Sequence, residues 1–218
     1  MTLQTRTPLW CGAIAGPLFT LVCLTEGAVR ADYDPLRHPV SSLALTDRGW
    51  VQILNFLLAG TLTITFAVGL RSVVRRSVWG PLLIGLFGAG LLGAGAFVTD
   101  PVGGYPPGTP DRMPDPTTHG SLHDGLSLAS FVALTAACLV FARSGSRSWR
   151  LYCLLSGLGF AAVMLTSSVT FGAEGSEGDL AGLLQRIAIT TAWTWQTVLA
   201  VRLLREGRLS EGEQSAAG

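Results

Sequence analysis

The sequence predicts an all-α, polytopic integral membrane protein, folded as one bundle of six transmembrane helices with both termini in the cytoplasm. Three observations predict this fold class. Of the 218 residues, 49% are hydrophobic and only 13% are charged, whereas soluble domains carry about 25% charged residues. Six segments reach or approach the length of about 20 apolar residues that a helix needs to cross a bilayer. The basic residues are all arginines, distributed unevenly between the two ends of these segments.

The same composition excludes other classes of protein. A chain this rich in apolar residues does not stay disordered, and a net charge of +1 gives no general attraction to nucleic acid. The four cysteines form no CxxC pair and lie inside the predicted spans, so we expect them to be small packing residues. Membrane lipids are the expected partners, with a hydrophobic small molecule if the bundle encloses a pocket. The whole chain, 1–218, is predicted to form a single membrane domain.

The first and third predicted spans differ in their proline, charged and small residues. The first contains Pro17 and Glu26, which make its outer end the least regular. The third holds no charged residue, and its Gly85, Ala89 and Gly93 follow the small-xxx-small spacing that allows helices to approach closely. We therefore expect the third span to pack tightly inside the bundle. The six predicted spans are 10–29, 50–70, 78–98, 125–142, 149–171 and 180–201.

The last three spans carry polar and aromatic residues at informative positions. Two threonines precede the fourth span and would cap its first turn. The sixth span contains Trp193 and Trp195, of which at least one must face inward, as ordinary packing or as one side of an apolar cavity. It also contains Arg186, which at that depth should face the bundle interior and find a carboxylate. Glu26, at a matching depth in the first span, is the first expected partner, with Asp100 or Glu174 next.

The arginines give the orientation of the bundle. By the positive-inside rule, the side with more arginines is cytoplasmic, which places both termini and the connections 71–77 and 143–148 inside. The outer loops are then 30–49, 99–121 and 172–179, and residues 205–218 form a flexible tail. The inner side holds Arg6, Arg71, Arg75, Arg76, Arg143, Arg147, Arg150, Arg202, Arg205 and Arg208, and the outer side holds Arg30, Arg37, Arg48, Arg112 and Arg186.

All three histidines of the chain, His38, His119 and His123, map to the outer face. His119 and His123 are four residues apart, so both rings can lie on one face of a helix. Three neutral imidazoles plus a water suit a catalytic zinc ion, and Asp100 or Asp124 could orient a ligand or accept a proton. The competing interpretation is structural, with the histidines hydrogen-bonded to loop carbonyls that they help to order.

Acid catalysis without a metal is the second chemical hypothesis. A buried carboxylic acid such as Glu26 or Asp100 could protonate a substrate inside an apolar cavity. The candidate catalytic residues are therefore Asp100, Glu26, Asp124 and Arg186. For Arg186, a structural tie between the first and last helices competes with contact to a substrate anion.

Two loop segments also form distinctive motifs. The first is Asp34-Pro35-Leu36-Arg37-His38-Pro39-Val40-Ser41-Ser42-Leu43. The second consists of Thr99-Asp100-Pro101, Gly104-Tyr105-Pro106-Pro107-Gly108 and Thr118-His119-Gly120-Ser121-Leu122-His123-Asp124. With these motifs the chain resembles the bacterial membrane family named domain of unknown function 998 (DUF998), over about 10–201. The resemblance implies six helices in one bundle and no settled activity.

Two further resemblances concern chemistry alone. The set of Ser, Asp and HxxxH residues at one membrane face resembles the sites of the seven-helix ceramidase and adiponectin-receptor hydrolases. Those enzymes hold zinc with three histidines. Small membrane terpene cyclases combine a similar size with acids facing an apolar pocket, although the chain has no DDxxD motif. The sequence therefore predicts an enzyme acting on an amphiphilic lipid or isoprenoid, by acid-triggered cyclisation or by metal-assisted hydrolysis. The alternative is a non-catalytic lipid-binding, assembly or transport component.

Overall fold

The computed structural model describes the backbone of residues 3–74, 77–171 and 180–216, and the side chains of residues 6–74, 77–171 and 180–207. Over these residues the chain is helical, without strands, and six helices are long and apolar enough to cross a membrane. The predicted loop 172–179 lies outside the described residues. The helices are α1 (Leu3–Val29), α2 (Gly49–Val73), α3 (Trp79–Ala96), α4 (Thr118–Phe141), α5 (Arg147–Thr170) and α6 (Ala181–Ala216), with a short 3-10 helix, η1 (Val40–Ala44).

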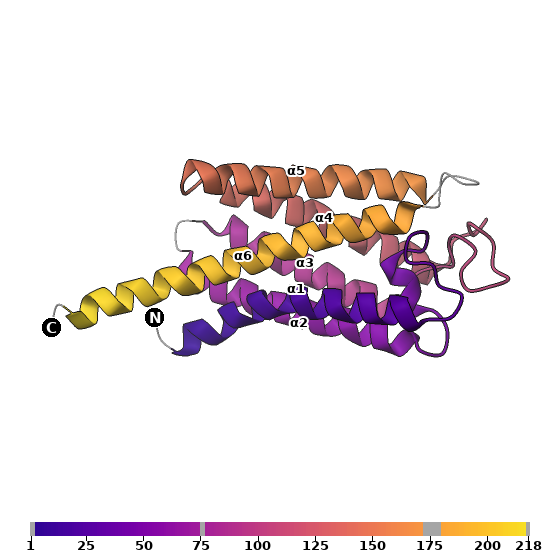
Figure 1. Cartoon of the computed structure of the whole chain (residues 1–218), viewed down its shortest axis with the longest axis horizontal. Coiled ribbons are helices and arrows are strands. Elements are labelled where there is room, and N and C mark those ends of the chain that lie inside the picture. The colour runs from indigo at the N-terminus through magenta and orange to yellow at the C-terminus, as the bar shows by residue number, and fades with distance from the viewer. Residues whose placement is uncertain (1–2, 75–76, 172–179, 217–218) are drawn as a thin grey trace.

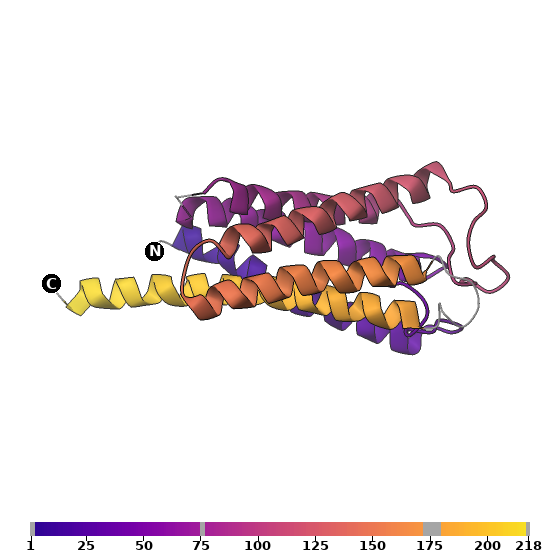
Figure 2. The same cartoon turned by 90° about the horizontal axis from the view of Figure 1, so that it is seen from above.

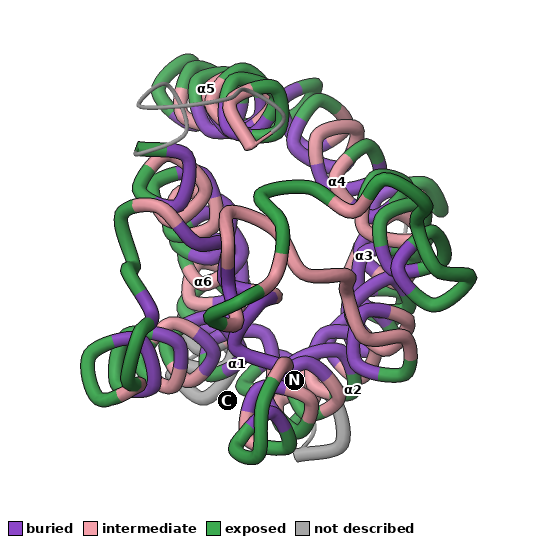
Figure 3. Tube along the Cα trace, turned by 90° about the vertical axis from the view of Figure 1, so that its right-hand side faces the viewer, coloured by how far each residue is buried: buried purple, intermediate pink, exposed green. Residues whose placement is uncertain are grey.

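The six helices run back and forth along one axis and form a closed ring. Both termini lie at one end of the bundle, the terminal end, and the long connections 30–48 and 97–117 lie at the opposite end, the loop end (Figure 1). Each helix packs against the helices before and after it in the chain, and α6 also packs against α1. Seen along the helices from the loop end, this order produces a ring (Figure 3). The ring surrounds a central cavity.

Packing around the ring is uneven. The pair α4 and α5 packs least tightly of the neighbouring helices, and the two diverge toward the loop end (Figure 2). By contrast, α3 packs tightly between its neighbours, where a Cβ on Gly93 would lie 2.5 Å from the Cδ1 of Leu126 in α4. The predicted tight packing of the third span is therefore confirmed at Gly93, whereas Ala89 of the same small-xxx-small series is exposed.

Three helix boundaries differ from the prediction by several residues. Helix α1 begins at Leu3 rather than at 10. Helix α4 begins at Thr118 rather than at 125, because the Thr117 hydroxyl accepts a hydrogen bond from the backbone N–H of Gly120 at 3.0 Å and caps the helix. Helix α6 continues past 201, so the tail predicted to be flexible is helical as far as Ala216. An ion pair between Arg202 and Glu206, one turn apart at 2.8 Å, supports this extension.

Candidate functional site

The six-helix ring encloses a cavity of about 850 Å³ in the half of the bundle nearer the loop end, lined by residues of all six helices and of both long connections. The part of the cavity farther from the loop end is apolar and aromatic. Of the two tryptophans of which at least one was expected to face inward, Trp193 lies here, and Trp195 is buried against Cys153. The aromatic residues of the lining are Phe19, Phe56, Phe87, Phe131, Phe160, Phe171 and Trp193.

His123 provides a basic nitrogen beside the cavity. The side chain lines the cavity and is only 4% exposed. Its Nδ1 lies 2.8 Å from the carbonyl oxygen of Phe97, and since a carbonyl can only accept, Nδ1 carries the proton. In the neutral imidazole, Nε2 therefore keeps its lone pair. The edge-to-face contact with Phe56, with ring centroids 6.2 Å apart, holds the imidazole in place.

Asp100 and Asp124 both line the cavity but differ in their partners. Asp100 accepts hydrogen bonds from the backbone N–H and the hydroxyl of Thr117, at 2.8 and 2.7 Å. These bonds hold the Asp100 side chain at the N-terminus of α4. For Asp124, in contrast, no hydrogen-bond or ion-pair partner is found among the described side chains. Of the two, Asp124 is therefore the carboxyl group free to act on a ligand.

His38 does not line the cavity and instead joins the two long connections. Its Nδ1 accepts the backbone N–H of Asp34 at 2.9 Å, and its Nε2 donates to the carbonyl of Gly103 at 3.1 Å. The ring lies against Tyr33 and Tyr105, with centroid distances of 5.4 and 5.1 Å. Burial lowers the pKa of His38 below its usual value, which favours the neutral form that this pattern requires.

Arg37 strengthens the same junction. Its Nε donates to the carbonyl of Gly103 at 3.2 Å, and its Nη2 pairs with Asp111 at 3.0 Å. The motif at 34–38 therefore holds the motif at 103–108 against the loop end of the ring. The competing, structural interpretation of the interfacial histidines describes His38 correctly.

Arg186 has different partners from those predicted. Its Nη1 donates to the carbonyls of His38 and Gly182, both at 3.0 Å, and its Nη2 donates to the Tyr33 hydroxyl. Burial raises the pKa of Tyr33 to about 12 even though Arg186 opposes this rise, so the phenol stays neutral. The expected ion pair with Glu26 is wrong, because Arg30 and Arg48 bind that carboxylate and the Arg186 guanidinium contacts the connection 30–48 instead. Glu174, a further expected partner, lies outside the described residues. Arg186 ties this connection to α6.

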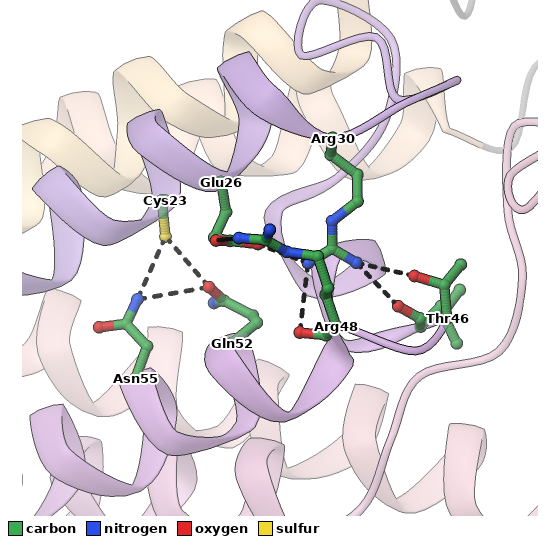
Figure 4. Close-up of polar contacts among 8 residues, drawn as sticks. Cys23, Glu26, Arg30, Thr46, Arg48, Gln52 and Asn55 are labelled. Atoms are coloured by element: carbon green, nitrogen blue, oxygen red, sulfur yellow. Dashed lines mark hydrogen bonds and ion pairs between the residues drawn. The ribbon is translucent and has the colours of Figure 1, made fainter.

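Glu26 is bound by two other arginines at the loop end of α1 (Figure 4). One oxygen accepts from Arg30 at 2.7 Å, and the other accepts from Arg48 at 2.6 Å. Arg30 also donates to the Thr46 hydroxyl at 2.7 Å and to the Leu45 carbonyl at 3.2 Å. Glu26 does not line the cavity. Its position is that of a structural anion between α1 and α2 rather than that of an acid facing a substrate.

A buried polar group continues this contact toward the middle of the bundle (Figure 4). The Asn55 amide donates to the Phe19 carbonyl at 3.2 Å, and the Cys23 thiol and Gln52 oxygen lie 3.6 Å apart. These contacts join α1 and α2, as hydrogen bonds between polar side chains do inside membrane-spanning bundles.

The three histidines do not converge. His38 lies at the loop junction and His123 lines the cavity, whereas His119 is exposed, with its ring against Phe97 at a centroid distance of 5.5 Å. Among the described residues, no group of three or more His, Cys, Asp or Glu side chains is placed to hold a metal ion. The shared three-histidine zinc site that the sequence suggested is therefore not formed by this geometry.

Several residues of the site were not identified from the sequence. Gln185 accepts the backbone N–H of Val40 at 2.7 Å, which holds η1 over the cavity. Arg112 also lines the cavity, as the cationic residue of its polar end. Tyr105 is buried between the loops, and its place in a Gly- and Pro-rich motif was the available signal. Gln185 and Arg112 carried no local signal, because chain folding alone brings them to the cavity.

The junction around His38 should loosen in acid. Because the pKa of His38 is lowered in the folded protein, its contribution to stability is complete above the unfolded value of about 6.5 and is lost as the pH falls below it. We expect the protection factors for hydrogen exchange in 99–117, corrected for the pH dependence of the intrinsic rate, to decrease as the pH falls from about 7.5 to about 5.5. The charged groups near this imidazole are Asp34, Arg37 and Arg186. His38→Gln should abolish this pH-dependent loss of protection, and His119→Gln should preserve it. A pH profile in His38→Gln that matches the wild-type profile would contradict the role of His38 at the junction.

Comparison with known proteins places the chain by family. A search of the curated proteins finds no match, and a search of the solved structures finds none either. The family described as "Protein of unknown function (DUF998)" matches residues 13–202, which is most of the chain and includes both loop motifs. The protein therefore belongs to the DUF998 family.

Proposed function

We propose that this protein is an integral-membrane enzyme that cyclises an amphiphilic isoprenoid by acid catalysis. The observation that carries the proposal is the composition of the cavity. It is lined by seven aromatic side chains and by a carboxyl group, Asp124, that has no hydrogen-bond or ion-pair partner among the described side chains and lies next to His123 with its basic nitrogen. A volume of about 850 Å³ is in the range of sites that enclose small-molecule ligands. The polar end would receive the head of the amphiphile and the aromatic part its chain.

The aromatic lining suits a cationic intermediate. Aromatic faces attract positive charge, and the attraction grows where water is excluded. Phe19 and Phe87 both contact the Trp193 ring, with centroids 5.3 Å apart in each pair. A carbocation that forms along the chain of the substrate would be surrounded by these faces. A cavity that only stored an acyl chain would not need these aromatic rings, because saturated side chains accommodate such a chain equally well.

The proposed reaction is an isomerisation whose atoms and protons balance. Asp124, protonated, transfers its proton to a terminal epoxide oxygen or alkene carbon of the substrate, and the resulting cation is attacked by the next double bond to form a carbon–carbon bond. A proton is then lost from carbon to Nε2 of His123 and returns through solvent to Asp124. The reaction consumes no co-reactant. Asp100, already bonded to Thr117, maintains α4 in position.

The proposal predicts a strong effect of Asp124→Asn. With the protein in nanodiscs and geranylgeraniol or its terminal epoxide as probe, product isomers of unchanged mass are measured by gas chromatography and mass spectrometry. The asparagine cannot deliver a proton, so we expect turnover to fall by about 100-fold or more. Asp115→Asn, an exposed residue that does not line the cavity, is the matched control and should keep full turnover.

Two outcomes would overturn the proposal. One is full turnover in Asp124→Asn. The other is binding of both probes by the wild-type protein without any product. This second result would favour the alternative function, a non-catalytic carrier or receptor for amphiphiles.

A further inference from the structure

We infer that the cavity opens sideways into the membrane between α4 and α5, and that the apolar chain of the ligand reaches the cavity through this opening. The inference deepens the proposed function and rests on it for the nature of the ligand. The opening itself is argued from packing and exposure, which do not depend on the reaction.

The lower limit of the opening is a set of close contacts between the two helices. A Cβ on Gly157 of α5 would lie 2.6 Å from the Cβ of Cys138 in α4, which shows how closely the backbones approach there. Nearer the loop end, the rings of Phe131 and Phe160 meet edge to face with centroids 5.7 Å apart. Beyond this pair α4 and α5 diverge (Figure 2). The opening therefore lies in the half of the bundle nearer the loop end.

The edges of the opening are cavity residues that are also strongly exposed. Leu128 of α4 and Val169 of α5 both line the cavity, and their side chains are 65% and 68% exposed. A side chain can satisfy both conditions only where the cavity meets the surface. Leu128 lies about 15 Å along α4 from its first residue, at 1.5 Å per residue. At that depth the surface of a membrane-spanning bundle faces hydrocarbon rather than water.

The opening is amphipathic along its length. Asp124 lies one turn from Leu128 toward the loop end, on the same face of α4, and Ser168 lies beside Val169; both also line the cavity. An amphiphile in the adjacent leaflet has the same order, with its polar head at the interface and its chain in the hydrocarbon. It can therefore move sideways into the cavity without carrying its chain through water, where apolar surface is unfavourable.

The competing route passes over the loop end, between the connections 30–48 and 97–117. The contacts of His38 and Arg37 with Gly103 narrow this route, although exposed cavity residues such as Arg112 show that the cavity also meets the surface there. The two routes make different predictions for bulky side chains at the edges of the opening.

The test uses a geranylgeraniol analogue with a diazirine at the end of its chain, incorporated in nanodiscs with the full-length protein. After a short illumination, adducts on the peptides that contain Phe87 and Trp193 are counted by mass spectrometry. The double variant Leu128→Trp with Val169→Trp should reduce these adducts several-fold, and Leu128→Ala should increase them. Val132→Trp and Leu165→Trp are the controls, because both side chains are exposed on the same helices but do not line the cavity.

The outcomes separate the inference from the proposed function. Equal adducts in the double variant and in the controls would overturn the lateral opening and leave the cavity as the binding site. An absence of adducts on these peptides in the wild-type protein would overturn the proposed function itself. Opposite changes in the Trp and Ala variants would support the lateral opening, since loss of folding cannot produce both.

Discussion

Replacing Glu26 with glutamine should destabilise the folded protein by about 3 kcal/mol, the lower part of the range for breaking a buried ion pair. The side chains of Glu26 and Arg30 are only 7% and 6% exposed, so the variant leaves a guanidinium charge buried without an anion. The carbonyl and hydroxyl groups that Arg30 also contacts keep the loss near the lower limit. The free energy of unfolding, measured by denaturant titration in mixed micelles, reports the effect.

Arg48→Gln is the matched control for this prediction. Arg48 bonds to the other oxygen of the same carboxylate, at 2.6 Å, but its side chain is 58% exposed. Solvent screens this second pair, and we expect a much smaller loss than in Glu26→Gln. Equal losses in the two variants would show that burial of the charge is not what makes Glu26 important.

Gly120→Ala should destabilise α4 by about 1–3 kcal/mol, as overpacking of a well-packed site does. A Cβ at this position would lie 2.1 Å from Oδ2 of Asp100. The carboxylate would have to move, and it would then lose its hydrogen bonds to the backbone and hydroxyl of Thr117. Gly120 of the second loop motif is therefore required because the Asp100 side chain approaches the helix backbone closely at this position.

Gly125→Ala, on the same helix, should have the opposite sign. No atom lies within 4 Å of a Cβ at Gly125, so the variant gains helix propensity, up to about 1 kcal/mol. In an Asp100→Ala background, the cost of Gly120→Ala should shrink, because the clashing carboxylate is gone. Additive losses in this double variant would contradict the contact. Thermal unfolding of the four variants in one detergent provides the comparison.

The six spans could be predicted because the bilayer imposes one length and one polarity on each of them. The length of the apolar segment predicts a start for α4 that is too late, because the helix begins at the cap that Thr117 provides and not at the first apolar residue. The pair between Glu26 and Arg30 was also visible in principle, since α1 continues to Val29 and residues four apart on a helix are neighbours.

Contacts made by the connections could not be predicted in this way. The Arg186 guanidinium binds the carbonyl of His38, 148 positions away in the chain, and no periodicity records such a contact. Spacing placed His119 and His123 on one helix face, but it did not reveal that only His123 lies deep enough to line the cavity. Residue type and spacing thus identified the polar end of the molecule, and folding of the loops decided each partner.

The closure of the ring by α6 against α1 has a consequence for biogenesis. Of these six helices α6 leaves the ribosome last, and it supplies both Gln185 and Trp193 to the cavity. A nascent chain with only the first five helices is therefore an open trough rather than a closed ring. A transcript truncated before α6 would yield a polypeptide that lacks the enclosed cavity.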